Sequence, residues 1–80
     1  MKLTGLKDLL PFVNFLKDMR LTYRMDHWRF DALTVTVYLV GIRLEVEFFD
    51  DHIEYSYFTG DESVHDDQAR LFEMIKEQGT

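Results

Sequence analysis

Two neighbouring stretches that alternate apolar and polar residues, separated by a glycine, most constrain how this chain can fold. Residues 32–40 alternate around β-branched positions such as Val35, and residues 42–49 alternate in the same way. A period of two is typical of a strand with one buried face, and Val40-Gly41 between the two stretches predicts a tight turn. The sequence therefore predicts an antiparallel β-hairpin at the centre of the chain.

Two further strands flank this hairpin. Residues 20–28 and residues 52–58 also alternate, and Asp50-Asp51 predicts the turn before the last strand, because aspartate tolerates left-handed backbone angles. Short connections favour pairing between neighbours in the chain. We therefore expect a four-stranded antiparallel β-meander.

The first twenty residues have a helical period instead. Apolar residues recur at steps of three and four and predict one buried stripe, widened by two phenylalanines: Leu6, Leu9, Leu10, Val13, Leu16 and Met19, with Phe12 and Phe15. Pro11 interrupts this stripe, and proline is tolerated only in the first turn of a helix. The helix is therefore either kinked at Pro11 or starts near Leu10.

A second helix is predicted from about Val64 or Asp66 to Gln78, with Ser63 as its N-cap. Its buried stripe is Leu71, Phe72 and Ile75. Two amphipathic helices can cover one apolar face of a sheet. The predicted fold class is therefore α+β, a four-stranded antiparallel β-meander with an N-terminal and a C-terminal helix packed on one face, in the order α-β-β-β-β-α. A chain of 80 residues makes one compact domain, residues 1–80.

Charge is distributed unevenly along the chain. Residues 1–43 carry a net charge of +3 and residues 44–80 one of −9, which gives −6 in total. Between Leu44 and Gln68 there are nine acidic residues, no Lys or Arg, and five aromatic residues. Negative charge repels phosphate, so we expect neither nucleic acid nor a membrane as a partner. The acidic stretch either captures a basic partner protein or serves only solubility.

Residue patterns that carry catalysis are missing from the sequence. There is no cysteine, and no serine stands in a G-x-S-x-G motif. His27, His52 and His65 each adjoin an acid but lack the spacing of a metal site. Glu45 and Glu47 share a strand face, where no pocket is expected to hold a substrate. We therefore predict no enzymatic activity, no metal and no cofactor; the missing cysteines also suit a cytoplasmic protein.

We predict instead a partner-binding surface in which outward rings act as anchors and carboxylates attract a basic protein. Its candidate residues lie on the last three strands and the turns around them: Tyr38, Glu45, Glu47, Phe49, Asp50, Asp51, Glu54, Phe58, Asp61 and Glu62. Trp28 is expected on the same side. The alternative is that these rings complete the core or protect strand edges.

Residues 23–58 read Y-R-M-D, then D-A-L-T-V-T-V, then G-I-R-L-E-V-E-F-F-D-D-H-I-E-Y-S-Y-F. This pattern resembles small bacterial immunity proteins of contact-dependent growth inhibition and polymorphic-toxin systems, although His52 stands where a glycine is usual after the aspartate. The resemblance implies a cytoplasmic protein that binds and neutralises the toxic domain delivered by a neighbouring cell, often a nuclease.

Other functions remain open from the sequence. One is an anti-defence inhibitor that mimics the charge of nucleic acid. Another is an adaptor domain that forms a homodimer through the open sheet face or an edge strand. A small hydrolase is the third, although no nucleophile and base are seen to converge.

Overall fold

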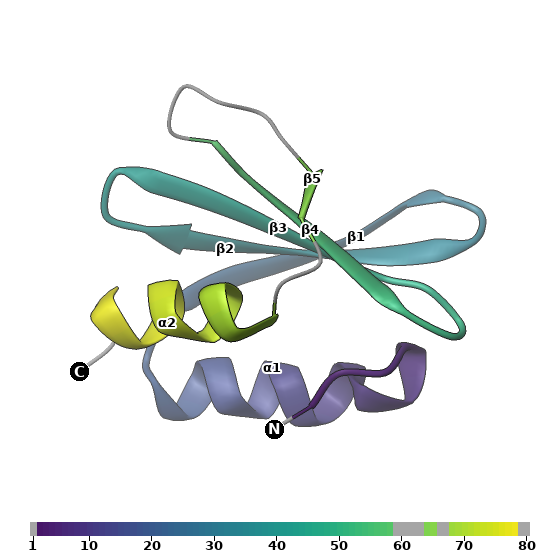
Figure 1. The fold of residues 1–80 in the computed structure, drawn as a ribbon, viewed down its shortest axis with the longest axis horizontal. Coiled ribbons are helices and arrows are strands. Elements are labelled where there is room, and N and C mark those ends of the chain that lie inside the picture. Colours follow the sequence, from purple (N-terminus) through teal and green to yellow (C-terminus); the bar gives the residue numbers. More distant parts are fainter. Residues whose placement is uncertain (1, 59–63, 66–67, 79–80) are drawn as a thin grey trace.

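The computed structural model describes residues 2–58, 64–65 and 68–78, and in it two helices lie on the same side of an antiparallel sheet (Figure 1). The elements follow one another as η1, a 3-10 helix (Leu6–Asp8), α1 (Leu9–Asp18), β1 (Thr22–Arg29), β2 (Ala32–Leu39), β3 (Ile42–Phe48), β4 (Ile53–Phe58), β5 (Val64–His65) and α2 (Gln68–Gln78). The strands lie side by side in chain order from β1 to β5. The predicted α+β fold is confirmed: in the chain, the meander β1 to β4 follows α1 and precedes α2.

The α1 helix begins at Leu9, so Pro11 lies in its first turn, where a missing N–H breaks no helical hydrogen bond. Of the two alternatives for Pro11, the late start is therefore the observed one. The helix ends in a Schellman motif, in which the Arg20 N–H donates to the Lys17 carbonyl and the Leu21 N–H to the Leu16 carbonyl, both at 3.0 Å. This motif turns the chain directly into β1.

Of the two predicted starts of the second helix, Val64 is wrong. The chain is extended at Val64, where β5 pairs antiparallel with β4, and α2 begins only at Gln68. Strand pairing satisfies the backbone groups of this segment, which a helix would satisfy internally. The predicted cap Ser63 and the alternative start Asp66 lie outside the described residues.

The first residue of α2 connects the helix to the N-terminal segment. The Gln68 side-chain amide donates to the carbonyl of Leu3 at 2.6 Å, and the Leu3 N–H donates back to Gln68 Oε1 at 2.9 Å. This pair of hydrogen bonds imitates one step of a β-ladder and holds the segment before η1 against α2.

The hydrophobic core lies between the sheet and the helices. Phe12 of α1 is central, since its ring centroid lies 5.5 Å from that of Phe48 in β3 and 6.3 Å from that of Phe72 in α2. Apolar side chains from the sheet and α2 surround it, and they are essentially inaccessible: Val35, Val37, Leu44, Val46, Tyr55, Leu71, Met74 and Ile75. The helix-facing alternation predicted for β2, β3 and β4 is thus confirmed.

Leu10, which the helical period placed in the buried stripe, is 68% exposed because α1 turns Phe12 and Val13, rather than Leu10, toward the sheet. Met25 is 51% exposed on the edge strand β1. Conversely, Met74 is buried although the predicted stripe of α2 did not include it.

The opposite side of the sheet, which we call the outward face, carries three rows of residues aligned by the strand register. The rows are Asp26, Thr34, Glu47 and Glu54; Arg24, Thr36, Glu45 and Ser56; and Thr22, Tyr38, Arg43 and Phe58. Thr34 and Thr36 point outward but are only 1% and 2% exposed. Longer side chains on the neighbouring strands cover them, and the indole N–H of Trp28 donates to the Thr34 hydroxyl at 3.2 Å. The centre of this face is therefore not open to water, contrary to the prediction.

The turn between β3 and β4 is longer than predicted and supports the N-terminal segment. Phe48 pairs with Ile53, so four residues connect the strands, and Phe49 and His52 belong to the turn rather than to the strands. The Leu6 N–H donates to the carbonyl of Phe49 at 2.7 Å. At Gly5, with φ at 149°, a Cβ atom would collide with the backbone carbonyl of Asp50. Glycine is therefore required for this close approach of two backbones.

Candidate protein-binding surfaces

Most carboxylates on the outward face are paired with arginines of the same chain. Arg24 Nε lies 2.8 Å from Asp26 Oδ2, and Arg43 Nε lies 3.6 Å from Glu45 Oε2. Such exposed pairs contribute little to stability, but they reduce the magnitude of the net charge on the face. The central part of this face is therefore close to charge balance.

A β-bulge brings a third arginine to the same face. Asp26 pairs with Thr34 and Arg29 pairs with Ala32, so β1 has one residue more than β2 between these pairs. Strict alternation would send Arg29 to the helix side of the sheet. The bulge reverses its direction, and Arg29 Nη1 lies 3.6 Å from Glu47 Oε2.

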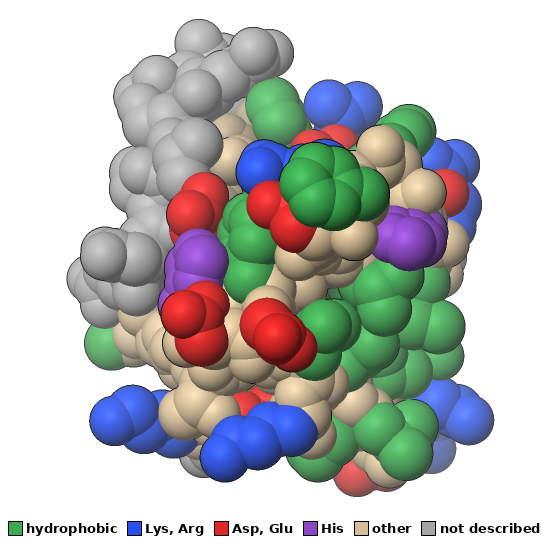
Figure 2. Space-filling model, turned by 90° about the vertical axis from the view of Figure 1, so that its right-hand side faces the viewer, with side chains coloured by type: hydrophobic (Ala, Val, Ile, Leu, Met, Phe, Trp, Pro, Cys, Tyr) green, Lys and Arg blue, Asp and Glu red, His purple; other side chains and the backbone are tan. Residues whose placement is uncertain are grey.

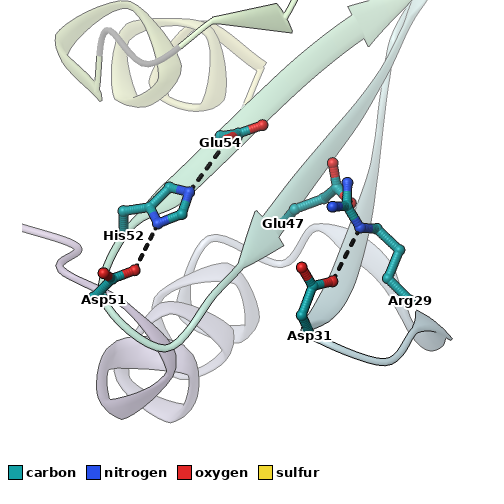
Figure 3. A network of polar contacts seen from close by, with 6 residues as sticks. All are labelled: Arg29, Asp31, Glu47, Asp51, His52 and Glu54. Carbon is teal, nitrogen blue, oxygen red and sulfur yellow. Dashed lines mark hydrogen bonds and ion pairs between the residues drawn. The ribbon is translucent and has the colours of Figure 1, made fainter.

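Two clusters of charged side chains face each other near the turn between β3 and β4 (Figure 3). In one, Arg29 approaches Glu47 and also Asp31, with 3.2 Å between Nε and Oδ1. In the other, the two ring nitrogens of His52 bind two carboxylates, with Nδ1 2.8 Å from Asp51 and Nε2 3.1 Å from Glu54.

The histidine in the second cluster responds to pH. Hydrogen bonds to Asp51 and to Glu54 favour the protonated ring and raise the pKa of His52 above its usual value. The bond from His52 in turn lowers the pKa of the Asp51 carboxyl. The ring becomes an imidazolium more readily than a free histidine, and it then neutralises part of the acidic charge.

Phe49 connects these two clusters, and its predicted role as an exposed anchor is wrong. Its side chain is only 8% exposed. The Phe49 ring stacks on the His52 ring at a centroid distance of 4.3 Å and an angle of 5°, and the guanidinium carbon of Arg29 lies 5.0 Å from its centroid. It is buried because the turn bends the chain after Phe48 instead of continuing the alternation of β3.

The other predicted residues lie in three places: at the far end of the outward face, in its middle row, and near the turn between β3 and β4. At the far end, Tyr38 is exposed, while Phe58 is partly buried with the Arg43 guanidinium carbon 4.4 Å from its ring centroid. Glu45 lies between the two ends in the middle row. Glu47, Asp50, Asp51 and Glu54 lie near the turn between β3 and β4, and of these Asp50 and Asp51 are exposed. The predicted Asp61 and Glu62 lie outside the described residues.

Negative charge is concentrated where the loop between β1 and β2 and the turn between β3 and β4 lie, which we call the hairpin end. Five carboxylates gather there, Asp31, Glu47, Asp50, Asp51 and Glu54, near the basic side chains Arg29, His52, His27 and Lys2. Figure 2 shows this end, with acidic and histidine side chains beside a hydrophobic area at the right.

The hairpin end also has an open recess of about 540 Å³, the hairpin-end recess, which the sequence reasoning missed. It is lined by Leu6, His27, Phe30, Asp31, Ala32, Leu33 and Asp50. Phe30 is 97% exposed, at the tip of the loop between β1 and β2. The available signal was an aromatic residue in a two-residue hairpin loop, where polar residues and glycine are usual. A smaller recess of about 400 Å³, lined by Lys2 and Gln68 among others, lies beside His52 and has mixed charge.

The described side chains offer shape and charge rather than an assembled reaction centre. Among residues 2–58, 64–65 and 68–78, no three His, Asp or Glu side chains are placed so that they could hold a metal ion. In the same part of the chain, neither helix has the length and apolar character needed to cross a membrane.

Comparison with protein-family models, with curated proteins and with solved structures finds no match for the chain.

Proposed function

We propose that this chain is an immunity protein, which binds a basic toxin domain in the cytoplasm and neutralises it without catalysis. The observation that supports the proposal best is the hairpin end, where five carboxylates gather beside the exposed rings of Trp28 and Phe30. The resemblance of residues 23–58 to immunity proteins points to the same class. A nuclease is the proposed toxin, because its substrate groove must carry positive charge to bind phosphate.

The arrangement suits fast and tight capture of such a domain. The excess of negative charge at one end of the protein attracts a cationic groove and raises the association rate. Exposed aromatic rings then supply buried contact area, and partner residues around them exclude water. The paired charges in the middle of the outward face fit the rim of an interface better than its anchor, because each carboxylate already has a partner.

The experiment uses the product of the adjacent gene, since an immunity gene lies directly after its toxin gene. We expect the purified protein to bind that product with a one-to-one end point, to abolish its nucleic-acid cleavage, and to bind more slowly as salt rises. The double variant Glu47→Gln with Glu54→Gln is expected to lower the association rate several-fold. The matched control is Glu73→Gln with Glu77→Gln, which removes two carboxylates from α2 far along the chain.

Three outcomes separate this proposal from its alternatives. Equal loss in both double variants means that the net charge of the protein matters and the hairpin end does not. Inhibition of unrelated nucleic-acid-binding proteins with similar strength supports a nucleic-acid mimic instead. A mass that doubles with concentration in sizing experiments, without binding to the neighbouring gene product, supports the homodimeric adaptor, for which β1 offers an unpaired sheet edge.

A further inference from the structure

We infer that the hairpin-end recess is the anchor pocket of the interface, and that it takes an aliphatic side chain flanked by lysine or arginine on a loop of the partner. The inference rests on the proposed function, because the occupant belongs to the basic partner protein. It goes further by placing the energetic centre of the interface in the recess and not on the outward face, where the sequence alone placed it.

The geometry of the recess supports an apolar anchor. Its walls come from three separate segments: Leu6 from η1, Phe30 to Leu33 from the first hairpin, and Asp50 from the turn between β3 and β4. A volume of about 540 Å³ exceeds what one leucine or isoleucine side chain requires, so the recess also accepts the flanking backbone. Phe30 is 97% exposed and lines the recess, so its ring offers apolar area that a partner can bury.

The charges around the recess define the rest of the occupant. Two carboxylates, Asp31 and Asp50, line the recess together with His27. Asp31 is already held by Arg29 at 3.2 Å, whereas in the described part of the chain the Asp50 carboxylate has neither an ion pair nor a side-chain hydrogen bond. A cation next to the inserted side chain would meet Asp50 directly and share Asp31 with Arg29. An acidic occupant would be repelled, and a second copy of this acidic chain would bring further carboxylates to the same place.

The support behind the recess is rigid, which favours a preformed pocket. Leu6 is fixed because its N–H donates to the Phe49 carbonyl at 2.7 Å, and Gly5 beside it touches the backbone of Asp50. Phe49 is in turn held by the stack on His52. Little conformational entropy is therefore lost in the pocket wall when the partner binds.

The first test maps the recess with defined peptides and needs no toxin. The probe is a capped heptapeptide with the sequence K-K-G-L-G-K-K, titrated into the isotope-labelled protein while amide shifts are followed by NMR. We expect the largest shifts at Leu6, Phe30 to Leu33 and Asp50. The peptide with serine in place of leucine is expected to bind about fivefold more weakly, since the apolar contact is lost, and E-E-G-L-G-E-E is expected to cause no shifts.

Two substitutions distinguish binding at the recess from nonspecific binding of the peptide. Phe30→Ala and Asp50→Asn are each expected to abolish the shifts at Leu6 and Leu33. The matched control is Val40→Ala, because Val40 is another apolar residue at a hairpin tip, 84% exposed and at the opposite end of the sheet. Shifts that follow Glu45 on the outward face, or that are equal for leucine and serine peptides, overturn the inference. Shifts at the recess that depend on protein concentration without peptide assign it to a second copy and also overturn it.

The second test separates this inference from the proposed function. With the neighbouring gene product as partner, Phe30→Ala is expected to weaken binding about 30-fold, mainly through a faster dissociation rate, as for a hot-spot residue. If the wild-type protein does not bind this partner, the proposed function fails. If it binds and Phe30→Ala binds equally well, only the anchor pocket fails.

Discussion

The outward face and the hairpin-end recess differ in whether their side chains have interaction partners within the protein. On the outward face, arginines of the chain meet its carboxylates, and Thr34 is covered by Trp28, its indole N–H bonded to the hydroxyl. In the recess, Phe30 is almost fully exposed and Asp50 has no ion pair within the described residues. The first region is complete without a partner, and the second is not.

This difference shows why density of charge in a sequence does not locate a binding site. Glu45 and Glu47 belong to the most acidic stretch of the chain, yet each has an arginine within 4 Å. Arg43 stands two residues before Glu45 on the same strand. Arg29, by contrast, comes from another strand, and only the bulged sheet register brings it near Glu47. Groups without partners, rather than groups with charge, distinguish the surface that is ready for a ligand.

The largest effect is expected from a charge placed on the helix side of the sheet that supports both regions. Val46→Asp should unfold the domain, because an unpaired buried carboxylate costs several kcal/mol and the whole domain is stable by about 5–15 kcal/mol. Glu47→Asp, one residue further on the outward face, should leave it folded. Circular dichroism with urea denaturation measures both. A folded Val46→Asp protein would mean that the two faces are not distinguished as described.

A smaller effect is expected where the recess is built. Gly5→Ala should lower the free energy of unfolding by about 2–3 kcal/mol, because the new Cβ collides with the Asp50 carbonyl and the positive φ is strained. The ion pairs of the outward face should stay unchanged. Urea denaturation gives the stability, and NMR shifts show which region moves. Shifts confined to the outward face would contradict the assignment of Gly5 to the recess wall.

Two aromatic residues at neighbouring positions sharpen the comparison further. Trp28→Ala should cost about 1 kcal/mol, since it removes the hydrogen bond to buried Thr34 and uncovers that residue. Phe30→Ala should change stability by less than about 0.5 kcal/mol, because Phe30 contacts mainly solvent. Thermal unfolding of both variants under the same conditions measures the two losses of stability. Equal losses would show that Phe30 has a structural role and weaken its role as an anchor.

The smallest effect concerns pH and the cluster around His52. Its pKa is higher in the folded protein than in the unfolded chain, so its bonds to Asp51 and Glu54 stabilise the fold fully below the usual histidine pKa. This stabilisation is lost as pH rises through the higher pKa of the folded state. Wild type should therefore lose more stability than His52→Gln between about pH 5.5 and pH 9. Identical pH profiles, or a His52 titration by NMR at or below the usual value, would contradict the geometry of this cluster.

Local chemistry was enough to determine the two helices, the four strands of the meander and their order, but not η1 or β5. The alternation of residues 32–49 and the turn at Gly41 gave the central hairpin, since period-two patterning can bury one side of a strand only. Because proline is tolerated only in the first turn of a helix, Pro11 pointed to a late start as one of two alternatives for α1. The acidic excess and the candidate carboxylates Glu47, Asp51 and Glu54, which do lie together, could also be named from the sequence.

What the tertiary structure alone decided depends on contacts between residues far apart in the chain. Phe49 is buried because the four-residue turn after Phe48 places its ring against His52 and Arg29, contacts that no periodicity predicts. Arg29 reaches Glu47 because of a bulge, which breaks the alternation on which sequence reading relies. The hairpin-end recess exists only where η1, the first hairpin and the turn after β3 meet, so no single stretch of sequence contains it.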